Sequence, residues 1–145
     1  MLGGNRQEMR VAFAALLETA LVTDNALCQD VFSYPLTDFA GHSPVTTVQS
    51  GGSMHEQYAP GSEDVGANLY INTYIAYAPA PDPNWTDEDV EERLDSIDAV
   101  IGHVIRDNQN SSYWTALTQT GESQTTFVVI GGVEYRREQV VVQVT

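Results

Sequence analysis

Residues 69–78 read LYINTYIAYA, and no other stretch of the chain points as clearly to one element of the fold. Aliphatic, threonine and tyrosine side chains dominate both alternating sets of positions, which is typical of a β-strand. The odd-numbered positions from Leu69 to Tyr77 point one way, and the even-numbered positions from Tyr70 to Ala76 point the other. Because neither set contains a charged residue, we expect both faces of this strand to be at least partly covered.

A long amphipathic helix is predicted downstream, from Thr86 to about Arg106. Thr86 is a favourable N-cap, Asp89 completes a capping-box arrangement, and Trp85 with Val90 occupies the hydrophobic-staple positions. Gly102 falls inside the helix, and we interpret it as a position of close packing against a sheet. Apolar residues recur at three- and four-residue spacing and predict the buried face: Val90, Leu94, Ile97, Ile101, Val104 and Ile105.

The N-terminal segment predicts another helix, from about Asn5 to Leu21, because apolar residues again recur at helical spacing. Asn5 is expected to cap the first turn. The helical pattern can resume from Asn25 to Phe32, and Tyr34-Pro35 is expected to end it, since a residue before proline avoids helical angles.

The remaining strands are predicted from shorter β-prone runs at 45–49, 125–130 and 133–144. Gly131-Gly132 separates the last two runs and suits a two-residue hairpin turn. The stretch at about 50–67, between the strands at 45–49 and 69–78, is rich in Gly, Ser and acidic residues, so we expect a long, mobile hairpin loop there.

This order of elements predicts an α+β fold, in which an antiparallel sheet of about four strands has two helices packed on one face. The whole chain, 1–145, is expected to be a single domain. A stiff connector is expected at 79–83, where three prolines alternate with other residues.

The charge balance limits the classes of partner. Twenty acidic residues face six basic ones, all arginine, which gives a net charge of −14. Such a chain repels phosphates, so specific binding to duplex DNA is not expected. No apolar run reaches the roughly 18 residues that span a bilayer, and the N-terminus lacks the pattern of a secretory signal. The single cysteine, Cys28, is expected to be buried and fits assembly in a reducing cytoplasm.

No pattern of catalytic, cofactor-binding or metal-ligating residues is present, and we expect the protein not to be an enzyme. The histidines lie far apart and have no partner at a ligand spacing: His42, His55 and His103. The Gly51-Gly52-Ser53 run lacks the flanking pattern of a nucleophile elbow. Gly131-Gly132 is followed by a strand rather than a helix, so it does not match a phosphate-binding loop.

Several segments follow one another in an order that is typical of one protein family. They are RVAFAALL at 10–17, PVTTV at 44–48, the tyrosine- and glutamate-containing stretch at 54–63, the strand at 68–78, the acidic helix at 86–106 and GGVEYRR at 131–137. With this order over nearly its whole length, the chain resembles the tail terminator proteins of long-tailed, siphovirus-type phages, the lambda-like group in particular.

The resemblance implies a homohexameric ring in the tail and neck of a virion, assembled in the host cytoplasm. Such a ring sits on the last ring of tail tube protein, stops polymerisation and presents a surface to the neck or head-completion protein. DNA passes through the lumen without specific binding, which fits acidic residues from the second helix or the 50–67 stretch facing the lumen. Interface contacts are expected from apolar or arginine residues in loops and at edges: Met54, Tyr58, Tyr113, Trp114, Arg136 and Arg137.

Alternatives remain open at this point. Tyr113 and Trp114 are equally compatible with ordinary core packing, and a surface or subunit salt bridge is favoured over an anion site for the arginine pair. Another head–tail joining protein of the neck has the same size and fold class. A tail-tube subunit predicts open-ended filaments, and a small ligand-binding domain predicts a stable monomer.

Overall fold

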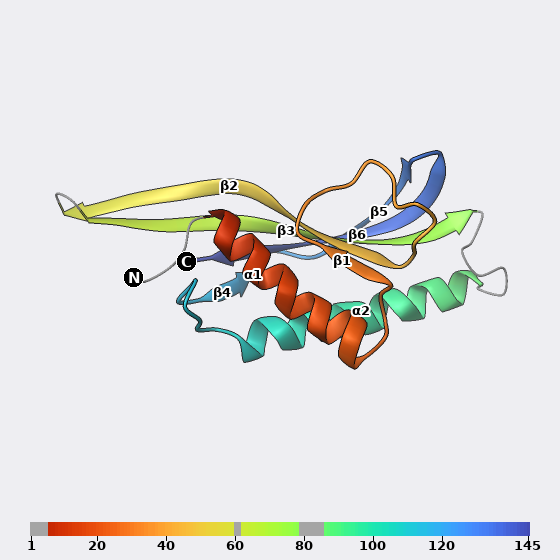
Figure 1. The fold of residues 1–145 in the computed structure, drawn as a ribbon, viewed down its shortest axis with the longest axis horizontal. Helices are drawn as coiled ribbons and strands as arrows, with labels where there is room; N and C mark the ends of the chain where they lie inside the picture. The colour runs from red at the N-terminus through yellow and green to blue at the C-terminus, as the bar shows by residue number, and fades with distance from the viewer. Residues whose placement is uncertain (1–5, 60–61, 79–85) are drawn as a thin grey trace.

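The computed structural model describes residues 6–59, 62–78 and 86–145, with the backbone alone at 52–59, 62–66 and 77–78. Helices and strands follow one another along the chain in a mixed order (Figure 1). They are α1 (Arg6–Glu18), the π-helix η1 (Thr19–Asp24), β1 (Asp30–Phe32), β2 (Val45–Ala59), β3 (Ser62–Ala78), α2 (Asp87–Asp107), β4 (Leu117–Gln119), β5 (Gln124–Ile130) and β6 (Val133–Val144).

The six described strands form one mixed sheet. Its order is β1-β2-β3-β6, and the other edge of β6 pairs with β4 and then with β5. Among the described strands, β1 alone runs parallel to its neighbour. The predicted α+β class is confirmed, but the prediction of about four antiparallel strands is wrong in number and direction. The two additional strands, β1 and β4, are three residues long, too short to show an alternating pattern.

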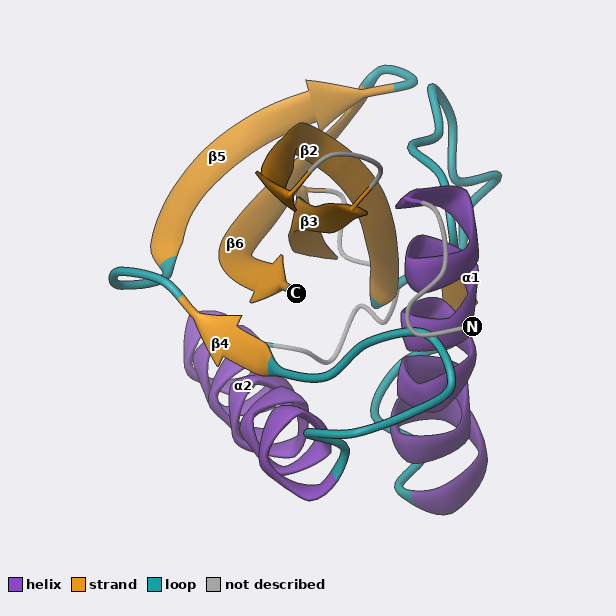
Figure 2. Cartoon of the chain, turned by 90° about the vertical axis from the view of Figure 1, so that its left-hand side faces the viewer, coloured by secondary structure: helices purple, strands orange, loops and turns teal. Residues whose placement is uncertain are grey.

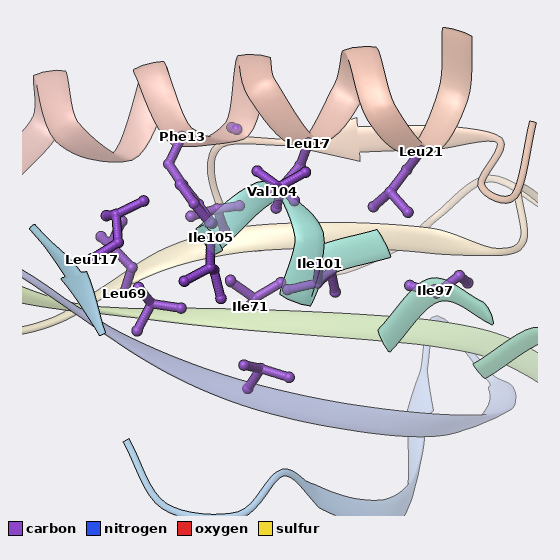
Figure 3. Packing of buried hydrophobic residues seen from close by; sticks show 14 of the residues in the cluster. Phe13, Leu17, Leu21, Leu69, Ile71, Ile97, Ile101, Val104, Ile105 and Leu117 are labelled. Atoms are coloured by element: carbon purple, nitrogen blue, oxygen red, sulfur yellow. The ribbon is translucent and has the colours of Figure 1, made fainter. Parts of the chain in front are cut away.

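Both helices pack against one face of the sheet, as predicted (Figure 2). Side chains from α1 and α2 meet those of β2, β3 and β6 in a single core, part of which is drawn in Figure 3. Phe13 and Leu17 of α1 point toward Leu69 and Ile71 of β3 in this view. The alternation at the C-terminal end of β6 is confirmed, because Val140, Val142 and Val144 are all buried in this core.

A smaller apolar cluster covers part of the opposite face. Phe39, from the segment between β1 and β2, packs on Tyr74 and Tyr135 with ring centroids 4.9 and 5.2 Å apart. Val45 and Ala76 complete the buried part of this cluster. The expectation that the strand at 69–78 is covered on both faces is therefore confirmed where its side chains are described.

The first helix differs from the prediction in its C-terminal part. The α-helical pattern ends at Glu18, and the π-helix η1 continues to Asp24. The chain then turns through Ala26, whose φ is +49°, and Asn25 closes the helix end by donating from Nδ2 to the carbonyl oxygen of Ala20 (2.7 Å). The predicted helical continuation to Phe32 is wrong, because residues 30–32 pair with β2 instead. Asn5 lies outside the described residues.

The second helix follows the prediction closely. Thr86 Oγ1 accepts a hydrogen bond from the backbone N–H of Asp89 (3.2 Å), and the Thr86 N–H donates to Asp89 Oδ2 (2.8 Å), which completes the capping box. All six predicted apolar positions are buried. The interpretation of Gly102 is wrong, because no atom outside the neighbouring backbone of α2 lies within 4 Å of the position that its Cβ would take. Trp85 and the 79–83 connector lie outside the described residues.

The stretch at about 50–67, predicted as a loop, contributes most of a long hairpin. β2 and β3 pair across it in antiparallel register, with Ser53 opposite Ala67 and His55 opposite Val65. The prediction failed because main-chain hydrogen bonding supports these strands without an apolar pattern. Figure 1 shows the hairpin extending well beyond the ends of both helices.

Candidate interaction surfaces

Two arginines of α1 hold the base of the hairpin. Arg10 Nη1 donates to Ser50 Oγ (2.8 Å), and Arg6 Nη1 donates to the carbonyl oxygen of Gly51 (3.3 Å). The strand pairing shifts directly after Ser50, and glycine suits position 51 because a Cβ there would be crowded, 3.0 Å from the Asn68 carbonyl oxygen. The irregular pairing and the two arginines together fix the direction in which the hairpin leaves the sheet.

An open, mainly apolar groove lies between α1 and the segment that follows α2. It has a volume of about 760 Å³, and its apolar lining comes from Val11, Ala15 and Leu16 of α1 and from Tyr113 and Trp114 in the segment after α2. Val11 is 47% exposed and Tyr113 is 41% exposed. Glu8 is the one ionisable carboxyl group among the lining residues. We call this surface the α1 groove.

A second exposed apolar surface lies on β5. Phe127 is 61% exposed and Val129 is 70% exposed. Both stand on the same side of the strand, opposite Arg136 and Glu134 of β6. Within the described part of the chain, β5 pairs with β6 alone, so its outer edge faces no other strand. We call Phe127 and Val129 the β5 ridge.

Carboxyl groups gather where α2 crosses β6. Arg136 forms an ion pair with Glu91, and Glu138, two positions along the same face of β6, is hydrogen-bonded to Asp98 and also near Asp95. Burial, followed by the nearby negative charge and hydrogen bond of Asp98, raises the pKa of Glu138 to about 7, against a smaller opposing effect of Arg136. This group is therefore half-protonated near neutral pH.

The remaining reactive groups have structural partners. Burial raises the pKa of the Cys28 thiol to about 11, and its Sγ lies 3.4 Å from Thr46 Oγ1, so the thiolate that would react is scarce at neutral pH. His42 is ion-paired with Asp30, and Arg106 Nη2 lies 2.8 Å from His103 Nδ1. In the described ranges no group of three or more potential ligands could hold a metal ion, and no helix there is long and apolar enough to cross a bilayer.

The sequence matches no protein-family model and no curated protein. The surfaces of the chain itself are therefore the basis for a functional proposal, together with the resemblance described above.

Of the six residues predicted to form an interface, four have described side chains, and the structure places these four in different surroundings. Met54 and Tyr58 are on β2 in the hairpin, and their side chains are outside the described part. Tyr113 lines the α1 groove. Arg136 and Arg137 point to opposite faces of the sheet, as predicted for neighbours on a strand, and Arg136 pairs within the chain.

Trp114 is a core residue rather than a surface anchor. Its side chain is 1% exposed, and its Nε1 donates to the carbonyl oxygen of Asn108 (2.7 Å). It also packs edge-on against Phe13, with ring centroids 6.1 Å apart. Of the two environments predicted for Trp114, a subunit interface and the core, the structure supports the core.

Sequence reasoning missed the exposed residues that stand out most in the structure. Val11 lies off the apolar stripe of α1. An isolated valine on the polar side of a helix was the one sequence feature that could have indicated an exposed apolar residue there. Phe127 and Val129 belong to a run from 123 to 133 with no charged residue, flanked by Glu122 and Glu134. Longer uncharged runs stand at 39–55, 65–81 and 108–121, so the charge pattern alone did not single out the β5 ridge.

Proposed function

We propose that the chain is a ring-forming structural protein of a long-tailed virus, a tail terminator that caps the tail tube and joins it to the neck. The proposal combines the resemblance of the sequence with three properties of the structure: the projecting hairpin, the two exposed apolar surfaces, and arginines that are engaged within the chain. In this role the protein acts by binding copies of itself, the tube protein and a neck protein.

The projecting hairpin carries the proposal. Its strands are 15 and 17 residues long, whereas strands in globular proteins usually have about 3–10 residues. Beyond its base the hairpin leaves the layer that the helices cover (Figure 1). An isolated two-stranded hairpin is only marginally stable in water. We therefore expect the outer part of the hairpin to rest on a neighbouring polypeptide, and each subunit of a ring has one on either side.

The charges suit a channel that DNA must pass. Arginines make contacts within the chain in several places: Arg6 and Arg10 with β2, Arg93 with the carbonyl oxygen of Leu27, and Arg136 with Glu91. The acidic residues on the outer side of α2, among them Glu88, Glu92 and Asp95, are exposed. A lumen lined with such side chains does not hold phosphates.

The test begins with the mass of the purified protein, alone and after addition of the tail tube protein of the same virus. The expected particle is a closed ring of 15.9 kDa subunits, and the resemblance implies six of them. Added to polymerising tail tubes, this ring is expected to stop their elongation. A variant in which Asn-Gly replaces residues 53–66 is expected to fold but to leave tube growth unchecked.

Other outcomes identify the alternatives. Open-ended filaments of the chain itself indicate a tube subunit. A closed ring that leaves tube growth unaffected but binds a capsid connector indicates a different joining protein of the neck. The α1 groove lies within the size range of small-molecule sites, about 300–1,000 Å³, so a stable monomer that binds a small molecule there contradicts the proposal.

A further inference from the structure

We infer that copies of this chain join head to tail, with the β5 ridge of one copy seated in the α1 groove of the next. The inference rests on the proposed ring and names the surfaces that build it. Phe127 and Val129 are the inserted side chains, and Val11, Ala15 and Tyr113 are the main receiving side chains.

Charge limits where two copies can meet. Each copy carries a net charge of −14, so close approach is unfavourable unless the facing surfaces carry little charge. The cross-strand neighbours of the β5 ridge, Arg136 and Glu134, carry opposite charges, and the α1 groove has one charged side chain, Glu8, among its described lining residues. These two surfaces are therefore suited to contact between like-charged copies, whereas the acidic outer side of α2 is not.

The two surfaces are also of compatible size. The β5 ridge presents two large side chains that are more than half exposed, and the α1 groove is an apolar hollow of about 760 Å³, a volume that suits a few bulky side chains. Exposed apolar groups of this size are typical of interaction sites when they occur together. Seating the ridge in the groove removes both surfaces from water at once.

Their positions on the molecule fit a ring. Figure 2 shows β5 along one flank and α1 along the opposite flank. In a contact between two different surfaces, one copy still offers its ridge and the other its groove to a further copy, so copies can add until the rotation closes. A two-fold dimer, in which one surface meets itself, does not have this property.

Two single substitutions test the contact. Phe127→Asp disables the ridge but leaves the groove, and Val11→Asp disables the groove but leaves the ridge. Each variant alone is expected to remain a monomer of 15.9 kDa under conditions in which the unchanged protein forms rings. Mixed in equal amounts, the two variants are expected to form heterodimers and nothing larger, because the intact ridge of one fits the intact groove of the other.

The matched control is Tyr34→Asp, which places the same charge at an apolar side chain that is 51% exposed and belongs to neither surface. It is expected to assemble normally. Circular dichroism and thermal unfolding establish that each variant folds. If either fails to fold, Val129→Lys and Ala15→Glu address the same two surfaces.

The outcomes separate this inference from the proposed function. If the unchanged protein forms rings and both single variants do so too, the ridge and the groove do not build the ring, although the ring itself stands. If each variant blocks assembly but their mixture gives no heterodimer, the two surfaces do not contact each other, and the inference is also overturned. If the unchanged protein stays monomeric even with the tube protein present, both the inference and the proposed function fail.

Discussion

Arg10 on α1 and Ser50 on β2 are joined by a hydrogen bond of 2.8 Å between Nη1 and Oγ, at the point where the long hairpin leaves the sheet. The Nε of Arg10 is buried and has no hydrogen-bond partner among the described atoms. The Arg10 side chain therefore acts as a brace, by which we mean that it links α1 to the base of the hairpin. Burying its unpaired Nε lowers the stability of the folded state. The benefit of the brace lies in fixing the base of a hairpin that has no helix layer behind its outer part.

The first prediction concerns this brace. Arg10→Met keeps an unbranched apolar stem but removes the hydrogen bond, so the hairpin base is expected to open more often. Hydrogen exchange of the backbone amides from 50 to 54 is expected to accelerate several-fold, while amides in α2 stay unchanged. Arg106→Met is the control, because Arg106 bonds to His103 on the same helix, away from the hairpin. Equal exchange in both variants contradicts a bracing role for Arg10.

The second prediction concerns pH. The pKa of Glu138 in the folded protein is raised to about 7 by burial and by Asp98, so the folded state holds a proton that the unfolded chain releases above about pH 4.3. The contribution of this group to the free energy of unfolding therefore falls as pH rises from about 4.5 to 7, and it stays low at higher pH.

Glu138→Gln removes this dependence, because glutamine remains neutral and still donates to Asp98. Urea unfolding is expected to give similar stabilities for the two proteins at pH 5 and a more stable variant at pH 8. Glu134→Gln, at an exposed position on the same strand, is expected to show no such difference. A Glu138→Gln effect of equal size at both pH values means that the proton on Glu138 is not responsible.

The parts of the fold that the sequence predicted are those determined by local interactions. The capping box of α2 lies within four residues, and its six buried positions follow from helical spacing alone. The strand at β1 was missed because its three residues become a strand only through pairing with β2, as Val31 does with Thr46. The outer part of the hairpin was predicted as its loop for the same reason, since Ser53 pairs with Ala67 without an apolar pattern to mark either one.

The candidate surfaces were even less accessible from the sequence. The α1 groove is lined by both Val11 and Tyr113, which lie about a hundred residues apart along the chain. The periodicity of apolar residues cannot predict a contact between residues so far apart in sequence. Tyr113 and its neighbour Trp114 looked alike in the sequence, yet the structure buries Trp114 and exposes part of Tyr113. Their different environments depend on where the segment after α2 meets α1.

The third prediction uses the corrected interpretation of Gly102. A Cβ at this position meets no atom outside the neighbouring helix backbone within 4 Å, so Gly102→Ala keeps the packing and gains helix propensity of about 0.5–1 kcal/mol. Thermal unfolding is expected to shift upward by about 2–4 °C. Gly51→Ala serves as the contrast, because its Cβ would lie 3.0 Å from both the Asn68 carbonyl oxygen and the Tyr70 ring, and it is expected to be destabilised. A loss of stability in Gly102→Ala means that the space beside the helix is not available.

The last prediction concerns the acidic side of α2 and rests on the proposed ring. Replacing Glu88, Glu92 and Asp95 by lysine changes the net charge from −14 to −8 per chain. If these exposed residues face the lumen, assembled rings are expected to bind duplex DNA at low salt, with affinity that falls steeply as salt increases, and virions are expected to release DNA more slowly. The control is the triple variant Glu18→Lys, Asp24→Lys and Glu122→Lys. It has the same net charge, but its three lysines lie at exposed positions outside α2. Equal DNA binding and equally slow release in the two variants would show that total charge, rather than the position of α2 in the ring, controls passage.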